Sequence, residues 1–130
     1  MKIIIIGFAI ILGAGGLFSF ANNGADQNTE PKQTIQTIQA DTKDGGQLID
    51  VRTPAEYTDG HIDGAVNLSL QDIEGGAVPT AAKDKPVYVY CRSGNRSAEA
   101  TSLLKNAGYQ NVIDLGGMNE VQSIGGTVKT

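Results

Sequence analysis

The chain has 130 residues, of which 40% are hydrophobic, 5% aromatic and 18% charged, and this length allows one domain of ordinary size. Its formal net charge of −4 disfavours nucleic acid and acidic surfaces as partners. It contains one cysteine and one histidine, which excludes an internal disulfide and leaves too few ligands for a zinc site, so we expect no bound metal.

The first 21 residues differ in composition from the rest of the chain. Lys2 gives a positive start, residues 3–18 are apolar or glycine, and Ser19-Phe20-Ala21 fits a small-x-small cleavage site. We expect a signal peptide over residues 1–21, and the alternative is an uncleaved N-terminal anchor. The protein is then periplasmic or secreted after cleavage, or membrane-anchored facing the periplasm. Cleavage removes Lys2 and leaves nine positive charges against fourteen negative ones.

Residues 22–33 are polar, contain Gly and Pro and show no periodicity, which predicts a flexible linker before a domain over residues 34–130. At the start of this domain, residues 34–38 suit either a first short strand or the entry to a helix. Residues 41–46 have the composition of a turn.

A strand over residues 48–51 precedes a helix with clear start signals. Thr53 is the expected N-cap, Pro54 suits the first helical position, and Glu56 completes a capping box with Thr53. Asp50 and Arg52 are spaced to pair at the end of the strand, and we expect Glu56 to be able to join them.

His61, the only histidine, follows this helix in a Gly-His-Ile turn. A general-base role is one interpretation, but a histidine at this place more often ties down a loop through hydrogen bonds. We therefore expect His61 to be structural.

The middle and the end of the chain give weaker signals. We expect turns at Gly60 and Gly64, a strand over 65–68, a helical turn over 71–74, a loop over 75–85 with a turn of helix at 80–83, a strand over 112–114 and a frayed end over 124–130.

The most informative stretch is residues 87–108. Val87 to Tyr90 has the composition of a short buried strand, and Ser97 to Ala107 shows helical spacing that ends at Gly108. Cys91 lies where the strand ends. A thiol in that position faces the backbone N–H groups of a tight turn and the positive end of a helix dipole, both of which favour the thiolate.

The residues after Cys91 are polar throughout and form the sequence Arg92, Ser93, Gly94, Asn95, Arg96 and Ser97. The two arginines add positive charge, and Gly94 readily allows a positive φ. A buried structural cysteine would not need such a loop. The pattern indicates a loop that holds an anion.

Two segments of the chain resemble the rhodanese (thiosulfate sulfurtransferase) family, in its exported single-domain type. YCRSGNRSA resembles the active-site loop of that family, and LIDVRTPAEYTDGHIDGAVNL, residues 48–68, resembles its first signature. Gly116-Gly117 is similar to its closing Gly-Gly turn, although the tryptophan that commonly follows is missing from residues 118–123. The fold implied is a single α/β domain with a mostly parallel central sheet and helices on both faces, consistent with the alternation of strands and helices.

The resemblance implies a thiosulfate sulfurtransferase that carries a sulfane sulfur as a persulfide on Cys91. No further cofactor is implied. The expected reaction partners are a small anionic sulfur donor and a thiol or cyanide acceptor, and the expected oligomeric state is a monomer. The expected catalytic residue is Cys91. The expected substrate-binding residues are Arg92, Ser93, Gly94, Asn95, Arg96 and Ser97, and the expected structural residues near the site are Asp50, Arg52 and Glu56.

Two other functions remain open at this stage. The first is a binding, regulatory or sulfur-carrier module that keeps the fold without turnover. The second is a cysteine phosphatase, since Cys-loop phosphatases also place an arginine after the cysteine. Four residues separate Cys91 from Arg96 here, where those phosphatases have five, and the smaller ring of N–H donors favours a single sulfur atom over a phosphoryl group.

Overall fold

The computed structural model of the chain describes residues 33–130. Its central sheet has four parallel strands in the order β3-β1-β4-β5. The strands are β1 (Gln47–Asp50), β3 (Val66–Asn67), β4 (Val87–Cys91) and β5 (Val112–Gly117). Every residue of β4 is buried, as expected for a strand covered on both faces. The predicted α/β architecture is confirmed.

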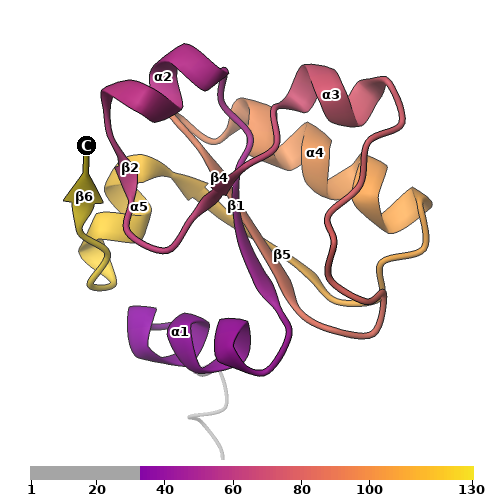
Figure 1. Cartoon of the computed structure of the whole chain (residues 1–130), viewed down its shortest axis with the longest axis horizontal. Helices are drawn as coiled ribbons and strands as arrows, with labels where there is room; N and C mark the ends of the chain where they lie inside the picture. The colour runs from indigo at the N-terminus through magenta and orange to yellow at the C-terminus, as the bar shows by residue number, and fades with distance from the viewer. Residues whose placement is uncertain (1–32) are drawn as a thin grey trace, which may run out of the picture. The chain divides into compact units, whose positions relative to one another are not determined.

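Helices cover both faces of this sheet (Figure 1). α3 (Leu70–Glu74) and α4 (Asn95–Asn106) pack on the face formed by Val87, Val89 and Cys91. α1 (Ile35–Lys43) and α5 (Met118–Ser123) pack on the opposite face, against Tyr88 and Tyr90. Because side chains alternate along a strand, β4 directs its cysteine towards α4 and its tyrosines the other way.

The start of the domain is helical. Thr34 caps α1, its hydroxyl oxygen accepting the N–H of Thr37 at 3.3 Å, and Ile35 and Ile38 lie one turn apart on the buried face. Of the two alternatives for residues 34–38, helix entry is therefore correct. The turn predicted over residues 41–46 is shorter than expected, since α1 continues to Lys43.

α2 (Pro54–Asp59) begins as predicted. The Thr53 hydroxyl accepts the N–H of Glu56 at 3.2 Å, and the Glu56 carboxylate accepts the N–H of Thr53 at 3.1 Å. Pro54 takes the first helical position. This capping box fixes the direction in which the segment leaves β1.

Two expectations about weakly patterned segments are wrong. Residues 80–83 form no helix. The chain end is not frayed, because β6 (Val128–Lys129) pairs antiparallel with β2 (His61–Ile62), and Lys129 lies 3.6 Å from Asp63. Two-residue strands carry no periodic signal, and their pairing joins segments more than sixty residues apart.

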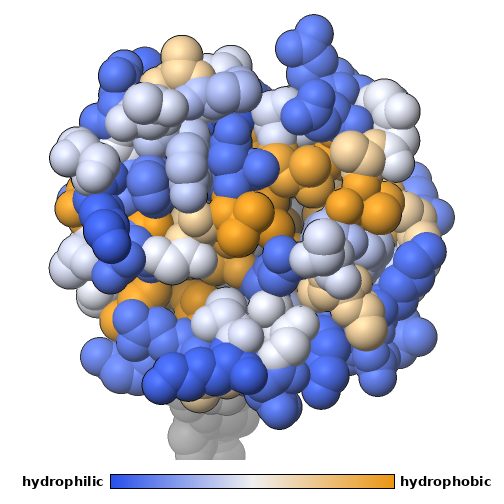
Figure 2. Space-filling view, in the orientation of Figure 1, coloured by the Kyte–Doolittle hydropathy of each residue, from blue (hydrophilic) through white to orange (hydrophobic). Residues whose placement is uncertain are grey.

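One face of the domain exposes apolar side chains across its middle, bordered by hydrophilic ones (Figure 2). The large hydrophobic residues with the greatest exposure among residues 33–130 are Val66, Val78 and Val128. Within the same range, no helix is long and apolar enough to cross a membrane. The predicted signal peptide or anchor and most of the predicted linker lie outside the described residues.

Candidate active site

Cys91 ends β4 and is completely buried, packed among Val51 and Ala100 on the α4 side of the sheet. The chain then turns through Arg92 and Ser93 to Gly94, and α4 begins at Asn95, two residues earlier than predicted. Gly94 has φ +102°, which is why glycine suits this position. The turn brings the start of α4 back over the sulfur of Cys91.

The thiol is surrounded by hydrogen-bond donors. The N–H of Gly94 donates to Sγ of Cys91 at 2.9 Å. Burial alone would raise the pKa of the Cys91 thiol, but hydrogen bonds from the hydroxyl and N–H of Ser97 and from the N–H groups of Gly94 and Ser93 outweigh burial and lower that pKa. The loop therefore stabilises a sulfur anion through the Ser97 hydroxyl and three backbone N–H groups, and the charge of Arg96 also interacts with Cys91.

Ser97 is fully buried beneath the loop. Its hydroxyl lies 3.1 Å from the carbonyl oxygen of Gly94 and 3.3 Å from that of Gly116. Because it has one hydrogen for these two acceptors and the sulfur, a charged sulfur competes with the carbonyls for it. Ser97 thus contacts the sulfur from the protein side, whereas Arg92, Ser93 and Asn95 are exposed at the outer edge of the loop.

Arg96 is engaged by Glu56. Its Nη1 and Nη2 donate to the two carboxylate oxygens of Glu56 at 2.8 and 3.1 Å. The hydrogen bond from Arg96 is the main reason why the pKa of Glu56 falls to about 2. The expectation that Glu56 joins Asp50 and Arg52 is wrong, because the helical turn of α2 directs Glu56 to the Cys91 loop.

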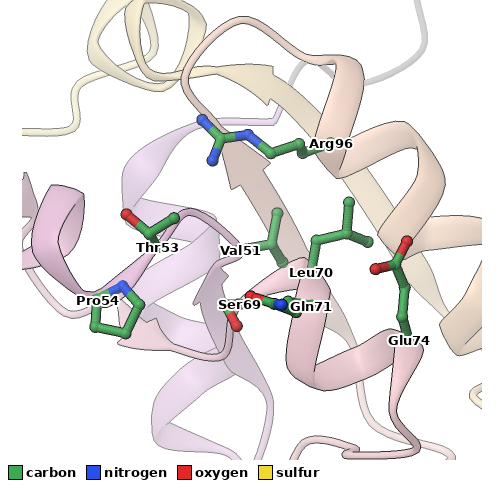
Figure 3. A pocket seen from close by; sticks show the side chains of 8 residues that line it. All are labelled: Val51, Thr53, Pro54, Ser69, Leu70, Gln71, Glu74 and Arg96. Carbon is green, nitrogen blue, oxygen red and sulfur yellow. The ribbon is translucent and has the colours of Figure 1, made fainter.

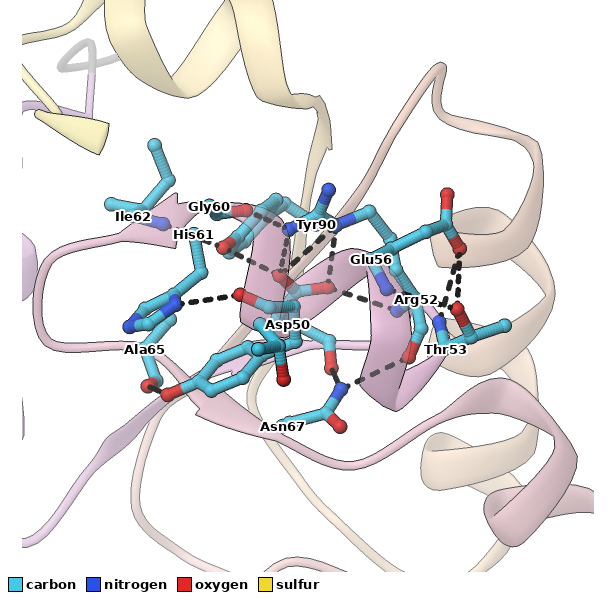
Figure 4. Close-up of polar contacts among 12 residues, drawn as sticks. Asp50, Arg52, Thr53, Glu56, Gly60, His61, Ile62, Ala65, Asn67 and Tyr90 are labelled. Carbon is cyan, nitrogen blue, oxygen red and sulfur yellow. Dashed lines mark hydrogen bonds and ion pairs between the residues drawn. The ribbon is translucent and has the colours of Figure 1, made fainter. Parts of the chain in front are cut away.

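Asp50 and Arg52 form the predicted pair, with Nη2 of Arg52 2.7 Å from Oδ2 of Asp50 and both side chains almost fully buried (Figure 4). Nη2 also donates to the carbonyl oxygen of Gly60 at 2.6 Å, which fastens the end of α2. The Tyr90 hydroxyl donates to Asp50 at 2.8 Å and accepts the N–H of Ile62 at 2.9 Å. Burial raises the pKa of Tyr90, which keeps the hydroxyl protonated.

His61 holds the loop after α2. Its ring stacks on Tyr57 with centroids 3.8 Å apart, and Nδ1 lies 2.9 Å from the carbonyl oxygen of Tyr57. The Tyr57 hydroxyl in turn donates to the carbonyl oxygen of Ala65 at 2.6 Å. The structural interpretation of His61 agrees with these contacts. Within residues 33–130, no three His, Cys, Asp or Glu side chains gather in a way that could hold a metal ion.

Residues 31–124 match the rhodanese-like domain family. The chain belongs to this family. It is 42% identical over 92 residues to a sulfurtransferase of Allochromatium vinosum, covering 69% of this chain and 82% of the relative. It is 37% identical over 75 residues to the thiosulfate sulfurtransferase PspE of Escherichia coli, covering 56% of this chain and 71% of the relative.

One solved structure and a further relative agree with this membership. A structure described as a rhodanese with anions from E. coli has a TM-score of 0.55 and 33% identity, covering 65% of this chain and 98% of that one. A putative sulfur carrier protein of Bacillus subtilis, YrkF, is 29% identical over 103 residues, covering 74% of this chain and 55% of the relative. The family membership and these relatives assign the chain to sulfur transfer in general.

Gly116 and Gly117 support the Cys91 loop of this rhodanese domain. Leu115 is an extra residue in β5, since Val89 pairs with Asp114 and Tyr90 with Gly116. A Cβ on Gly117 would lie 2.7 Å from the carbonyl oxygen of Arg92, so only glycine lets the loop approach β5 this closely. Residues 118–123, where the tryptophan is missing, contribute Val121 of α5 to the core, and this side chain is fully buried.

Two recesses flank the Glu56–Arg96 pair. One, of about 240 Å³, lies between α2, α3 and α4, with Arg96 and Glu74 among its lining residues (Figure 3). The other, of about 370 Å³, lies beside Arg92 and is also lined by Asp59, Met118 and Val128. The rhodanese loop thus has a separate recess on each side of one ion pair.

Sequence reasoning missed two contributors to the site, Tyr90 and Met118. Two tyrosines on one side of an otherwise valine-rich strand were a usable signal for Tyr90, since a buried phenol needs a polar partner and Asp50 ends the neighbouring strand. Met118 had no such signal, because its place beside Arg92 depends on the bulge in β5.

Proposed function

We propose that this rhodanese-family protein is a thiosulfate-type sulfurtransferase. The Cys91 thiolate attacks the outer sulfur of the donor, the sulfur–sulfur bond breaks, and sulfite leaves with the bonding electrons. The persulfide on Cys91 then passes its outer sulfur to a thiol or cyanide acceptor. The anionic donor needs no separate cofactor in this scheme.

The observation that carries this proposal is the ring of donors around Sγ. The N–H of Gly94 lies 2.9 Å from the sulfur, and the hydrogen bonds that lower the pKa of Cys91 come from a loop already shaped before any substrate arrives. Donors fixed in this way stabilise both the starting thiolate and a persulfide anion. Arg92, exposed at the edge of the loop, supplies a cation that attracts the anionic donor.

The test is the intact mass of the protein after incubation with thiosulfate and removal of excess donor. The wild type gains one sulfur atom, and Cys91→Ser, which keeps the size of the side chain but cannot hold a sulfane sulfur, gains none. A wild type that gains no sulfur from thiosulfate or any other sulfane donor would overturn the proposal.

The similarity to YrkF favours a second candidate, a sulfur carrier whose cysteine is loaded with sulfur but which does not catalyse repeated turnover. Steady-state assays with thiosulfate and cyanide separate the two candidates. The transferase releases many thiocyanate ions per protein molecule, whereas the carrier releases at most the sulfur it held. Aryl phosphate hydrolysis, measured in parallel, is expected to be negligible.

We also propose that residues 1–21 direct export and are removed, so that the protein works in the periplasm or outside the cell. N-terminal sequencing of the protein from a periplasmic or extracellular fraction tests this, with Asn22 expected first. A full-length chain found only in membranes would favour the anchor instead.

A further inference from the structure

The recess beside Arg92 combines charge of both signs with an apolar wall. It has a volume of about 370 Å³, near the lower end of the roughly 300–1,000 Å³ usual for small-molecule sites. Arg92 borders it from the Cys91 loop, and Asp59 borders it from the end of α2. Met118 of α5 and Val128 of β6 supply the apolar part.

The other two charged residues that line this recess are already neutralised. Arg52 is paired with Asp50 at 2.7 Å, and Glu56 is paired with Arg96 at 2.8 Å. Neither Arg92 nor Asp59 belongs to any ion pair formed within residues 33–130. The recess therefore presents one available cation and one available anion, which do not pair with each other.

The wall opposite the loop is built into the fold. Val128 pairs with Ile62 across the small antiparallel sheet, and a Cβ on Gly60 would lie 3.2 Å from Val128. Met118 is half-buried, and its N–H donates to the carbonyl oxygen of Arg92 at 3.3 Å. The apolar side chains are thus held in place against the residue that follows Cys91.

We propose that this recess binds the sulfur acceptor and selects a low-molecular-weight amino-acid thiol in its zwitterionic form, an inference that rests on the proposed function. The carboxylate of the acceptor pairs with Arg92 and its ammonium group pairs with Asp59. Its methylene carbons contact Met118 and Val128. The acceptor thiolate attacks the outer sulfur of the Cys91 persulfide, a new sulfur–sulfur bond forms, and Cys91 leaves as the thiolate. The acceptor departs as a persulfide, and no oxidant or reductant is needed.

Four thiols test this assignment, because they carry the two charged groups separately. Cysteine has both groups, 3-mercaptopropionate has the carboxylate only, cysteamine has the ammonium only, and 2-mercaptoethanol has neither. The full-length protein is loaded with thiosulfate, freed of donor and mixed with each thiol, and the rate of sulfur loss is followed by intact mass. For each thiol, the rate of sulfur loss from the wild type is divided by the rate from the variant. The intrinsic reactivity of the thiol cancels in this ratio.

Arg92→Gln is expected to slow cysteine and 3-mercaptopropionate about twofold to fivefold more than the other two thiols, the size usual for an exposed charge pair. Asp59→Asn is expected to slow cysteine and cysteamine by a similar factor relative to the others. Lys129→Gln changes the net charge as Arg92→Gln does, at a residue that is paired with Asp63 and does not line the recess, and it should affect all four thiols alike. Equal ratios for all four thiols in Arg92→Gln and Asp59→Asn would overturn the assignment.

A binding measurement keeps this test separate from the fate of the proposed function. S-methylcysteine is zwitterionic but cannot accept sulfur, and its binding to the unloaded protein can be followed by calorimetry. If thiosulfate fails to load Cys91, the transferase proposal fails, while binding that both Arg92→Gln and Asp59→Asn weaken still supports the recess. Absence of binding to the wild type, or binding that neither variant changes, contradicts it.

Discussion

Two ion pairs begin within seven residues of each other in the chain, and they differ in burial and in what they hold. Asp50 and Arg52 have side chains that are 0% and 7% exposed, whereas Glu56 and Arg96 are 27% and 34% exposed. The first pair joins β1 to the end of α2, and the second joins α2 to the Cys91 loop. One short segment thus supplies both a structural connection and a connection to the site. The predictions below follow this comparison from the largest expected effect to the smallest.

Breaking the buried pair should cost the most stability. Arg52→Met leaves the Asp50 carboxylate buried without its partner and frees the carbonyl oxygen of Gly60. We expect a loss of about 3–5 kcal/mol in the free energy of unfolding, measured by urea titration. A loss below about 1 kcal/mol would show that water reaches Asp50 and that this pair resembles the exposed one.

Tyr90→Phe removes the hydroxyl that links Asp50 to the N–H of Ile62. We expect a loss of about 1–3 kcal/mol in unfolding free energy, since a buried N–H is left unsatisfied. Tyr57→Phe is the matched control, because its hydroxyl bonds only one carbonyl oxygen and is partly exposed. Equal losses in the two variants would contradict a special role for the Tyr90 network.

Sequence reasoning found the pair tested by the first prediction and missed the Tyr90 hydroxyl tested by the second. The capping box at Thr53 and the pairing of Asp50 with Arg52 are local, so spacing alone revealed them. The partner of Glu56 is 40 residues away, and the strand at Val128 pairs with one at Ile62, so no local pattern could reveal either contact. The sequence indicated that the Cys91 loop holds an anion, but the recess beside Arg92 depends on long-range packing.

Breaking the half-exposed pair should change the site more than the stability. Glu56→Gln removes the charge that neutralises Arg96, and the expected loss in unfolding free energy is about 1 kcal/mol or less. The released positive charge should lower the pKa of Cys91 further and reduce the KM for thiosulfate, by about fivefold at most. Stopped-flow loading of the persulfide at several donor concentrations measures this. A higher KM with unchanged stability would mean that Glu56 positions Arg96 for the donor.

Acid should weaken the half-exposed Glu56–Arg96 pair over a defined pH range. The pKa of Glu56 is about 2 in the folded protein against 4.5 ordinarily, so the folded state binds fewer protons and its stability rises with pH between these values. The contribution of the pair is complete above about pH 4.5 and is lost as the pH falls towards 2. Urea titrations across this pH range should show the unfolding free energies of the wild type and Glu56→Gln converging at the acid end. Parallel curves would contradict the assignment to Glu56.

The central claim is that the loop from Cys91 to Ser97 stabilises a sulfur anion before any substrate binds. The most direct test is a pH titration of the ultraviolet absorbance of the Cys91 thiolate, with Cys91→Ser as the baseline and the urea-unfolded protein as the reference. The claim predicts a midpoint in the folded protein below that of the unfolded chain, because hydrogen bonds from Ser97, Gly94 and Ser93 outweigh burial. A midpoint equal to or above that of the unfolded chain would contradict it.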